Sequence, residues 1–292
     1  MSLHKLKRPF MNLRLIFSLF LTAIFSLLLE SSIAWANWEL LPESYHQLYD
    51  TWGQFIDEQA ALLNTGQARL WTSLGGTLPV IGDEESIHHP EFVLHASANA
   101  GLHYNDNLRI WTETLDVRLG FAVEWELHSK LRFSVGYTHF SAHTADGVVP
   151  ADSDLIEPSV GQEFVPIRVV YDIKNNLRLA ATIKPFVRSY PPVHPIWLDQ
   201  SIEYFPWGAK DSRQFSPYLA FGLDESGIQG HSMTLTSHAQ IGAYIGNHMS
   251  PGHRQTIRTV LGYYNGMDPR LKYFELRNAK QQFAYLGVMF DL

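Results

Sequence analysis

A histidine, a serine and a second histidine stand at alternate positions in the stretch GYTHFSAHTADG, from Gly136 to Gly147. Alternate residues of an extended strand project from one face, so His139 and Ser141 would lie about 6.5 Å apart along that face. A serine hydroxyl beside an imidazole is the minimum that an activated nucleophile with a general base requires. One interpretation of the stretch is therefore a hydrolytic pair. The other is a strand that becomes polar where it leaves an apolar environment.

A hydrolytic pair also needs a group that orients the imidazole. Asp146 is close to the pair in the sequence, so His139, Ser141 and Asp146 form the candidate catalytic set. The orienting group stays open, because further carboxylates follow in the next connection at Asp152, Asp154 and Glu157.

His139 and His143 share a strand face, which makes them an alternative pair for binding a metal ion or a lipopolysaccharide headgroup. The other histidines show no ligand spacing, and we assign the chain no metal site and no cofactor. There is no cysteine, which excludes disulfides and thiolate sites. A net charge of −7 without a basic run argues against nucleic acid as a partner.

The elements around the stretch have a period of two residues. In TLDVRLGFAVEWEL, from Thr114 to Leu127, one set of alternate residues is apolar and the other is polar or small. A helix would mix these sets, whereas a strand separates them onto two faces. Strands are predicted at 91–103, 114–127, 130–143, 164–173, 177–189, 197–207, 216–225, 232–246, 256–266 and 281–292, and 67–80 is a candidate for a further pair.

Long strands with one apolar face fit either a soluble sandwich or a transmembrane barrel. The segments reach the roughly 9–11 residues that a tilted strand needs to cross a membrane. Connections are short at His128–Ser129 and at Lys174–Asn176, and long at 144–163 and 267–280. Charged residues make up 17% of the chain and aromatic residues 13%, which suits an apolar outer surface. We therefore predict an all-β, antiparallel transmembrane barrel of about 10–12 strands.

The N-terminal residues predict a secretory signal. Basic residues precede the apolar run Leu15–Leu29, and small residues follow at Ala34 and Ala36. An uncleaved anchor helix is the alternative, although the run is short for spanning. Helical spacing then predicts an amphipathic helix from about Glu43 to Leu63. The expected organisation is a cleaved signal peptide at 1–36, a helical segment at 37–66 and a barrel at 67–292.

The polar strand faces would line the interior of such a barrel. Because both signs of charge occur there, ion pairs across the lumen are the default expectation, and a selective path for a small solute is the alternative. Arg178, Lys184 and Arg188 are the candidate binding residues of such a path, with His143 a candidate at the surface. The charged residues expected in the interior are Asp116, Arg118, Glu124, Arg132, Arg168, Arg178, Lys184, Arg188, Asp199, Glu203 and Arg258.

An even number of strands places both chain ends in the periplasm, so the strand at 130–143 ends on the extracellular side. Its odd-numbered residues begin on the apolar face, which places His139, Ser141 and His143 outward, at the depth of the outer-leaflet headgroups. The last strand, QFAYLGVMFDL, is similar to the C-terminal signal for insertion by the barrel-assembly machinery, with Leu292 in place of a final aromatic residue. The expected location is the bacterial outer membrane, with its lipids as partners.

Two resemblances bear on function. His139–Phe140–Ser141 resembles the His-x-Ser pair of the outer-membrane phospholipase A family and the lipid A deacylases, although Ala142 replaces the usual asparagine. The run H-x-S-x-H-x-x-D, together with GYYNGMDPRLKYF and FAYLGVMFDL, is similar to a domain-of-unknown-function family of outer-membrane barrels. The first resemblance implies a lipid-ester hydrolase. The second implies a barrel and no particular activity.

Three functions follow from these observations. The sequence favours a non-enzymatic barrel, either structural or a narrow conduit for small solutes. The first alternative is an outer-leaflet lipid-ester hydrolase that uses His139 and Ser141. The second is a surface binding protein that uses the 144–163 loop.

Overall fold

The computed structural model describes residues 38–40, 60–64, 69–83, 90–104, 110–145, 160–174, 176–208, 215–246, 256–267 and 281–291. These residues form strands and the turns that join them. The same ranges contain no helix that is long and apolar enough to cross a membrane. The predicted signal peptide at 1–36 and most of the predicted helix lie outside the described residues.

The strands are long and pair antiparallel with their neighbours. Their bounds are β1 Trp38–Leu40, β2 Ala60–Asn64, β3 Arg69–Asp83, β4 Glu91–Tyr104, β5 Ile110–His128, β6 Leu131–Thr144, β7 Val160–Phe164, β8 Ile167–Lys174, β9 Leu177–Tyr190, β10 Ile196–Tyr204, β11 Phe215–Ser226, β12 Thr234–Gly246, β13 Thr256–Gly266 and β14 Gln281–Asp291.

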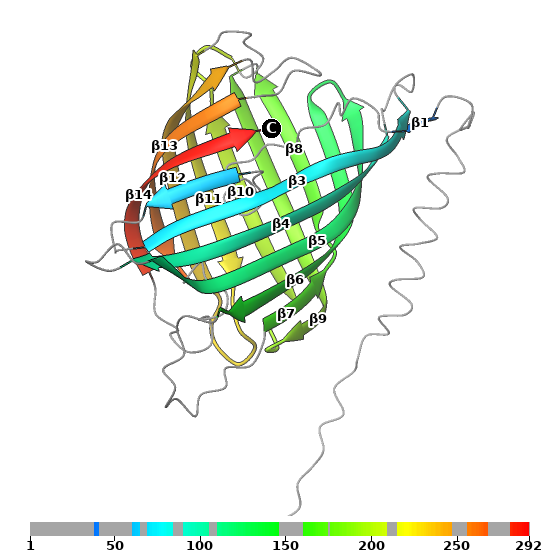
Figure 1. Cartoon of the computed structure of the whole chain (residues 1–292). Helices are drawn as coiled ribbons and strands as arrows, with labels where there is room; N and C mark the ends of the chain where they lie inside the picture. The colour runs from blue at the N-terminus through cyan, green and yellow to red at the C-terminus, as the bar shows by residue number, and fades with distance from the viewer. Residues whose placement is uncertain are drawn as a thin grey trace, which may run out of the picture. The chain divides into compact units, whose positions relative to one another are not determined.

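The pairing order returns to its starting point. From β4 it runs through β5, β6, the pair β7 and β8, and then β9 to β14. β14 pairs with β2, β2 pairs with β3, and β3 pairs with β4. β7 and β8 occupy one position between β6 and β9, because Val165 and Pro166 interrupt a single path. Figure 1 shows these strands wrapping around a common interior.

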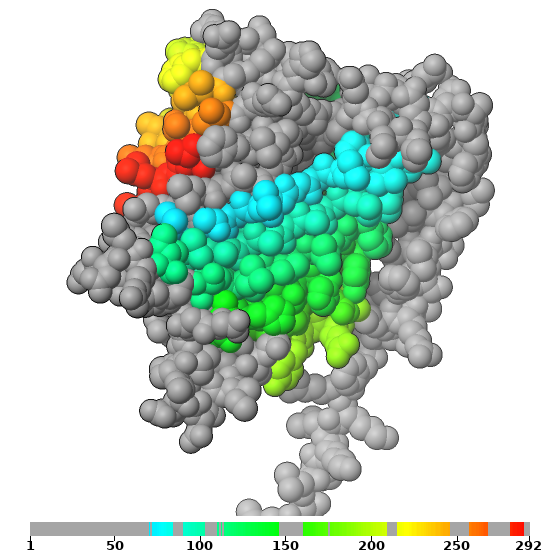
Figure 2. All heavy atoms as spheres, in the orientation of Figure 1, coloured from blue at the N-terminus to red at the C-terminus, as the bar shows by residue number. Residues whose placement is uncertain are grey.

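The polarity of the two sheet faces is the reverse of that in a soluble protein. Outward residues are apolar and accessible, and Leu74, Ile241 and Leu286 are 66%, 55% and 66% exposed. Inward residues include charged groups such as Arg258 and Glu203, which are 0% and 1% exposed. Figure 2 shows β3 to β6 forming one continuous outer face. An apolar exterior around a polar interior is typical of strands that face lipid.

Near the end of β6, the interior is apolar and packed. Phe140, Ala142, Val160 and Phe164 form a buried cluster against which Phe186 packs. The rings of Phe164 and Phe186 lie 5.4 Å apart. Buried rings of this kind hold neighbouring strands in fixed positions, so the outward residues of β6 and β7 stand on a rigid support.

The structure confirms the all-β, antiparallel class and corrects the predicted N-terminal boundary. Residues 67–80 correspond to β3, and the partner of β3 is β2, at Ala60–Asn64. The helical prediction for 37–66 is therefore wrong for these five residues and for the three residues of β1, Trp38–Leu40. Adjacent apolar residues at Leu62 and Leu63 fit both a helix and a strand. The pairing of strands favours the strand over the helix. As a strand, β2 hydrogen-bonds to the backbones of both β14 and β3, whose N–H and C=O groups could find no partner in lipid.

Candidate functional site

β6 presents the His-Ser-His stretch on its outer face. Its inward residues Phe140 and Ala142 are buried. His139 and His143, on either side of them, are exposed, and Ser141 between them is partly exposed. β6 begins at the short turn after β5, so these residues lie near the opposite end of the strand. The candidate pair is therefore positioned toward the surroundings of the sheet, away from its polar interior.

A carboxylate faces His139 from the adjacent strand. Glu163 of β7 is the register partner of His139, and its Oε1 lies 3.7 Å from His139 Nδ1. The side chains of the two residues are 46% and 26% exposed. A carboxylate at Nδ1 orients an imidazole so that Nε2 is left for a nucleophile, which is the arrangement of a Ser-His-acid triad. Sequence reasoning missed Glu163 and treated it as the end of the 144–163 connection.

Ser141 and His139 share one face of β6 at neighbouring outward positions, and in the described structure they are not hydrogen-bonded to each other. Side chains at this spacing meet after a rotation of the imidazole. Catalytic hydrogen bonds are often long in a protein without its substrate and tighten when substrate binds. The structure therefore places a hydroxyl, an imidazole and a carboxylate on one surface, with the imidazole and carboxylate 3.7 Å apart.

A bulge in β9 places Arg188 beside this group. Glu163 pairs with Arg188, the next residue Phe164 pairs with Phe186, and the register shifts between them. Arg188 is consequently exposed on the outer face, level with Glu163. The prediction that Arg188 lines the interior is wrong, because strict alternation along β9 does not continue past the bulge.

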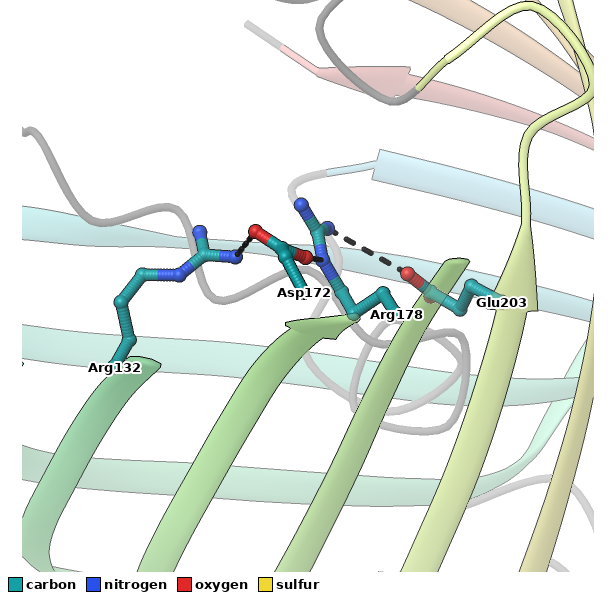
Figure 3. A network of polar contacts seen from close by, with 4 residues as sticks. All are labelled: Arg132, Asp172, Arg178 and Glu203. Carbon is teal, nitrogen blue, oxygen red and sulfur yellow. Dashed lines mark hydrogen bonds and ion pairs between the residues drawn. The ribbon is translucent and has the colours of Figure 1, made fainter. Parts of the chain in front are cut away.

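Three of the predicted interior cations, Arg132, Arg178 and Lys184, form ion pairs. Arg132 and Arg178 bind the two oxygens of Asp172 at 2.8 and 2.9 Å, and Arg178 lies 3.5 Å from Glu203. Figure 3 shows Asp172 between the two arginines, with Glu203 on the far side of Arg178. Lys184 forms an ion pair with Asp199. Arg178 and Lys184, proposed from the sequence as binding residues, thus have carboxylate partners on adjacent strands, so these pairs run along the wall and not across the lumen.

The remaining candidates have different outcomes. Asp146 lies outside the described residues, as do Asp152, Asp154 and Glu157. His143 is exposed on the outer face of β6, beyond Ser141. Within the described ranges, no group of three or more histidine and carboxylate side chains is arranged to hold a metal ion.

The fold is that of bacterial outer-membrane barrels, by comparison with solved structures. The outer membrane phospholipase A from Escherichia coli is 11% identical to this chain, with a TM-score of 0.52 over 87% of this chain and 95% of that one. A NanC porin is 12% identical, with a TM-score of 0.41 over 80% and 98% of the two chains. OprB from Pseudomonas putida is 8% identical, with a TM-score of 0.34 over 87% and 100%. At these identities the likeness concerns the fold alone.

No family model and no curated protein sequence matches the chain. The expected resemblance to outer-membrane barrels is therefore confirmed at the level of fold. The resemblance to a particular family of unknown function has no matching family model to support it.

Proposed function

We propose that this chain is an outer-membrane barrel that hydrolyses lipid esters at the outer leaflet. Ser141 is the nucleophile, His139 the general base and Glu163 the residue that orients the imidazole. The observation that carries the proposal is the Glu163 carboxylate, 3.7 Å from His139 Nδ1 on the outer face. An enzyme with this exterior meets its substrate in the membrane, and the protein of similar fold from Escherichia coli is named a phospholipase.

The chemistry follows from the positions of the three groups. The Ser141 hydroxyl attacks the ester carbonyl carbon while His139 Nε2 accepts its proton. The tetrahedral intermediate then expels the lipid alcohol, which takes the proton back from His139, and an acyl-serine remains. Water activated by the same imidazole releases the fatty acid and restores Ser141. Throughout, Glu163 stabilises the imidazolium that forms at each proton transfer.

The decisive experiment uses the refolded full-length protein on matched lipids. Phospholipid and lipid A are offered in detergent micelles, each beside an analogue whose cleavable ester is replaced by an ether. Fatty acid is expected from at least one ester lipid and from no ether analogue. Release from no ester lipid, in protein shown to be folded by its circular dichroism, would contradict the proposal.

Glu163 is expected to contribute strongly to the rate. Replacing the carboxylate, as in Glu163→Gln, should lower kcat by about a hundredfold, because the imidazolium loses its counter-charge and the ring its fixed orientation. KM should change little, since Glu163 contacts the base and not the lipid. Steady-state kinetics on the preferred ester lipid measure both constants.

Glu225 supplies the matched control for this change. It is an exposed carboxylate at the same end of the barrel, on the outer face of β11. Glu225→Gln removes one negative charge without touching His139 and should leave kcat unchanged. Equal losses in the two variants would show that a general charge effect, and not orientation of His139, explains the Glu163 result.

A conduit is less well supported than an enzyme, although the sequence alone favoured it. The interior contains the paired Arg132, Asp172 and Arg178, and Arg258 lies over the rings of Tyr218 and Tyr244. Fixed, paired charges in a barrel of this size are expected to close the path for ions. Planar bilayers containing the protein should show no stepwise conductance, with a porin measured in parallel as the positive control. Regular single-channel steps would instead support the function of a conduit.

A further inference from the structure

Gly161 leaves a space directly beside Ser141 on the outer face. It is the register partner of Ser141 on one side and of Tyr190 on the other. A Cβ atom built on Gly161 meets no atom within 4 Å, whereas at Gly136 and Gly242 it would collide with the neighbouring strand. Packing therefore does not require glycine at 161. Since glycine also weakens a strand, the missing side chain points to a role outside the fold itself.

Arg188 supplies a positive charge at the rim of this space. It lies two residues before Tyr190 on β9 and is exposed on the same outer face as Ser141. A guanidinium binds the oxygens of a phosphate through paired hydrogen bonds. In an apolar exterior, an outward cation of this kind is costly unless it reaches the interface or binds an anion. Glu163, its register partner, is one anion beside it, and a lipid phosphate would be a second.

The placement of the two residues matches the shape of a phosphate-bearing ester lipid. By register, Arg188 stands level with His139 and Glu163, one outward row from the row of Ser141, Gly161 and Tyr190. Ser141 and Arg188 are two strands apart, which is about 10 Å across the sheet. An extended arginine side chain and the glycerol or sugar backbone of a lipid together span that separation.

We propose that Gly161 and Arg188 form the substrate-positioning surface of this site, in which Arg188 binds the phosphate of a membrane lipid and the space at Gly161 admits its ester to Ser141. The proposal rests on the hydrolase function for its catalytic meaning, but it makes a separate claim about binding. Arg188 and Gly161 are positioning residues, because neither takes part in the bond changes at Ser141.

The test combines turnover with a binding measurement that needs no turnover. Turnover is compared on a phosphate-bearing ester lipid and on a diacylglycerol with the same chains. Binding is measured by native mass spectrometry on the Ser141→Ala protein, with phosphatidylglycerol and lipid A as separate probes. Arg188→Gln should weaken binding of the phosphate-bearing lipid by about ten- to a hundredfold. Hydrolysis of that lipid should fall by a similar factor, while hydrolysis of the diacylglycerol stays unchanged.

Gly161→Val should reduce hydrolysis of both lipids by more than about tenfold, because the side chain fills the space beside Ser141 without a clash in the strand. Its melting temperature should equal that of the native protein. Two controls match these changes in kind. Lys130→Gln removes an exposed cation at the turn between β5 and β6, and Ala181→Val places a valine at an exposed position on the outer face of β9. Both should behave as the native protein.

The outcomes separate the two claims. If the native protein hydrolyses no lipid but Arg188→Gln still weakens binding of the phosphate-bearing lipid, the hydrolase fails and the phosphate contact of the positioning surface stands. If hydrolysis is found but neither change alters binding or the preference for phosphate, the positioning surface is overturned and the hydrolase stands. A preference between the two probes identifies whether the phosphate belongs to a glycerophospholipid or to lipid A.

Discussion

Replacing Ser141 by alanine is expected to lower the rate of lipid-ester hydrolysis by at least about a thousandfold while the barrel remains folded. No other group of the site can take the acyl chain from the ester, so the acyl-enzyme cannot form. The side chain faces outward and is partly exposed, so its hydroxyl fills no interior space. Initial rates of fatty-acid release measure the loss, and a labelled fluorophosphonate reports whether Ser141 is the residue that reacts.

His139 should act together with Ser141 and not independently of it. His139→Ala alone is expected to produce a loss of similar size, and the double variant should be no slower than either single one, because both residues serve one proton transfer. Ser237→Ala is the matched control, since Ser237 is a partly exposed serine of β12. Additive losses for the two single changes, or a loss in the Ser237 variant, would contradict a coupled pair.

Alternation was enough to predict most of the strands, for a physical reason. A strand between lipid and a polar interior must be apolar on one face only, so Thr114–Leu127 and its counterparts carry a clear period of two. The predicted ranges agree closely with β4 to β14 except for β7, whose residues were assigned to the 144–163 connection. β2 carries no such signal over five residues, and it is defined by the neighbours that pair with it.

The site was half predictable. Placing His139 and Ser141 together needs only the period of a single strand. Finding Glu163 needs the register between β6 and β7, and the connection between those strands is too long for a turn type to fix that register. One signal was present: in VGQEFVP, Val160 and Phe164 alternate as strand residues do, which places Glu163 on a strand instead of in a loop.

Arg188 shows a second limit of prediction from the sequence, which is the face of a strand beyond a bulge. A bulge shifts the faces of every residue beyond it, and nothing in KPFVRSY marks the shift except Pro185, whose neighbourhood is irregular. Counting alternate residues from Arg178 and Lys184 therefore placed Arg188 in the interior. The correction matters for function, because it moves a cation from a possible lumen path to the outer face beside Glu163.

The second large prediction concerns the stability of the barrel, which depends on the ion pairs in its interior. Asp172 bridges Arg132 and Arg178, and with Glu203 the network joins β6, β8, β9 and β10. Asp172→Ala should lower the free energy of unfolding by about 3 kcal/mol, because two nearly buried guanidiniums then face each other without the carboxylate between them. The expected loss is at the lower end of the usual range, since the side chains of Arg132 and Asp172 keep 13% and 14% exposure. Urea unfolding in lipid bilayers, followed by tryptophan fluorescence, measures it.

A second replacement distinguishes loss of an ion pair from loss of packing. If repulsion between the arginines is the cause, Arg132→Met in the Asp172→Ala background should recover part of the stability, because it removes one of the two guanidiniums that repel each other and keeps an apolar side chain of similar length. Lys174→Ala, a change at an exposed residue at the end of β8, should have no effect. A double variant less stable than Asp172→Ala would instead assign the loss to packing.

Because β6 carries Arg132 at its start and Ser141 near its end, the two residues lie far apart along the strand. Asp172→Ala protein below its unfolding midpoint should therefore still hydrolyse lipid at the native rate. This result would separate the ion pairs that stabilise the barrel from the chemistry on its surface.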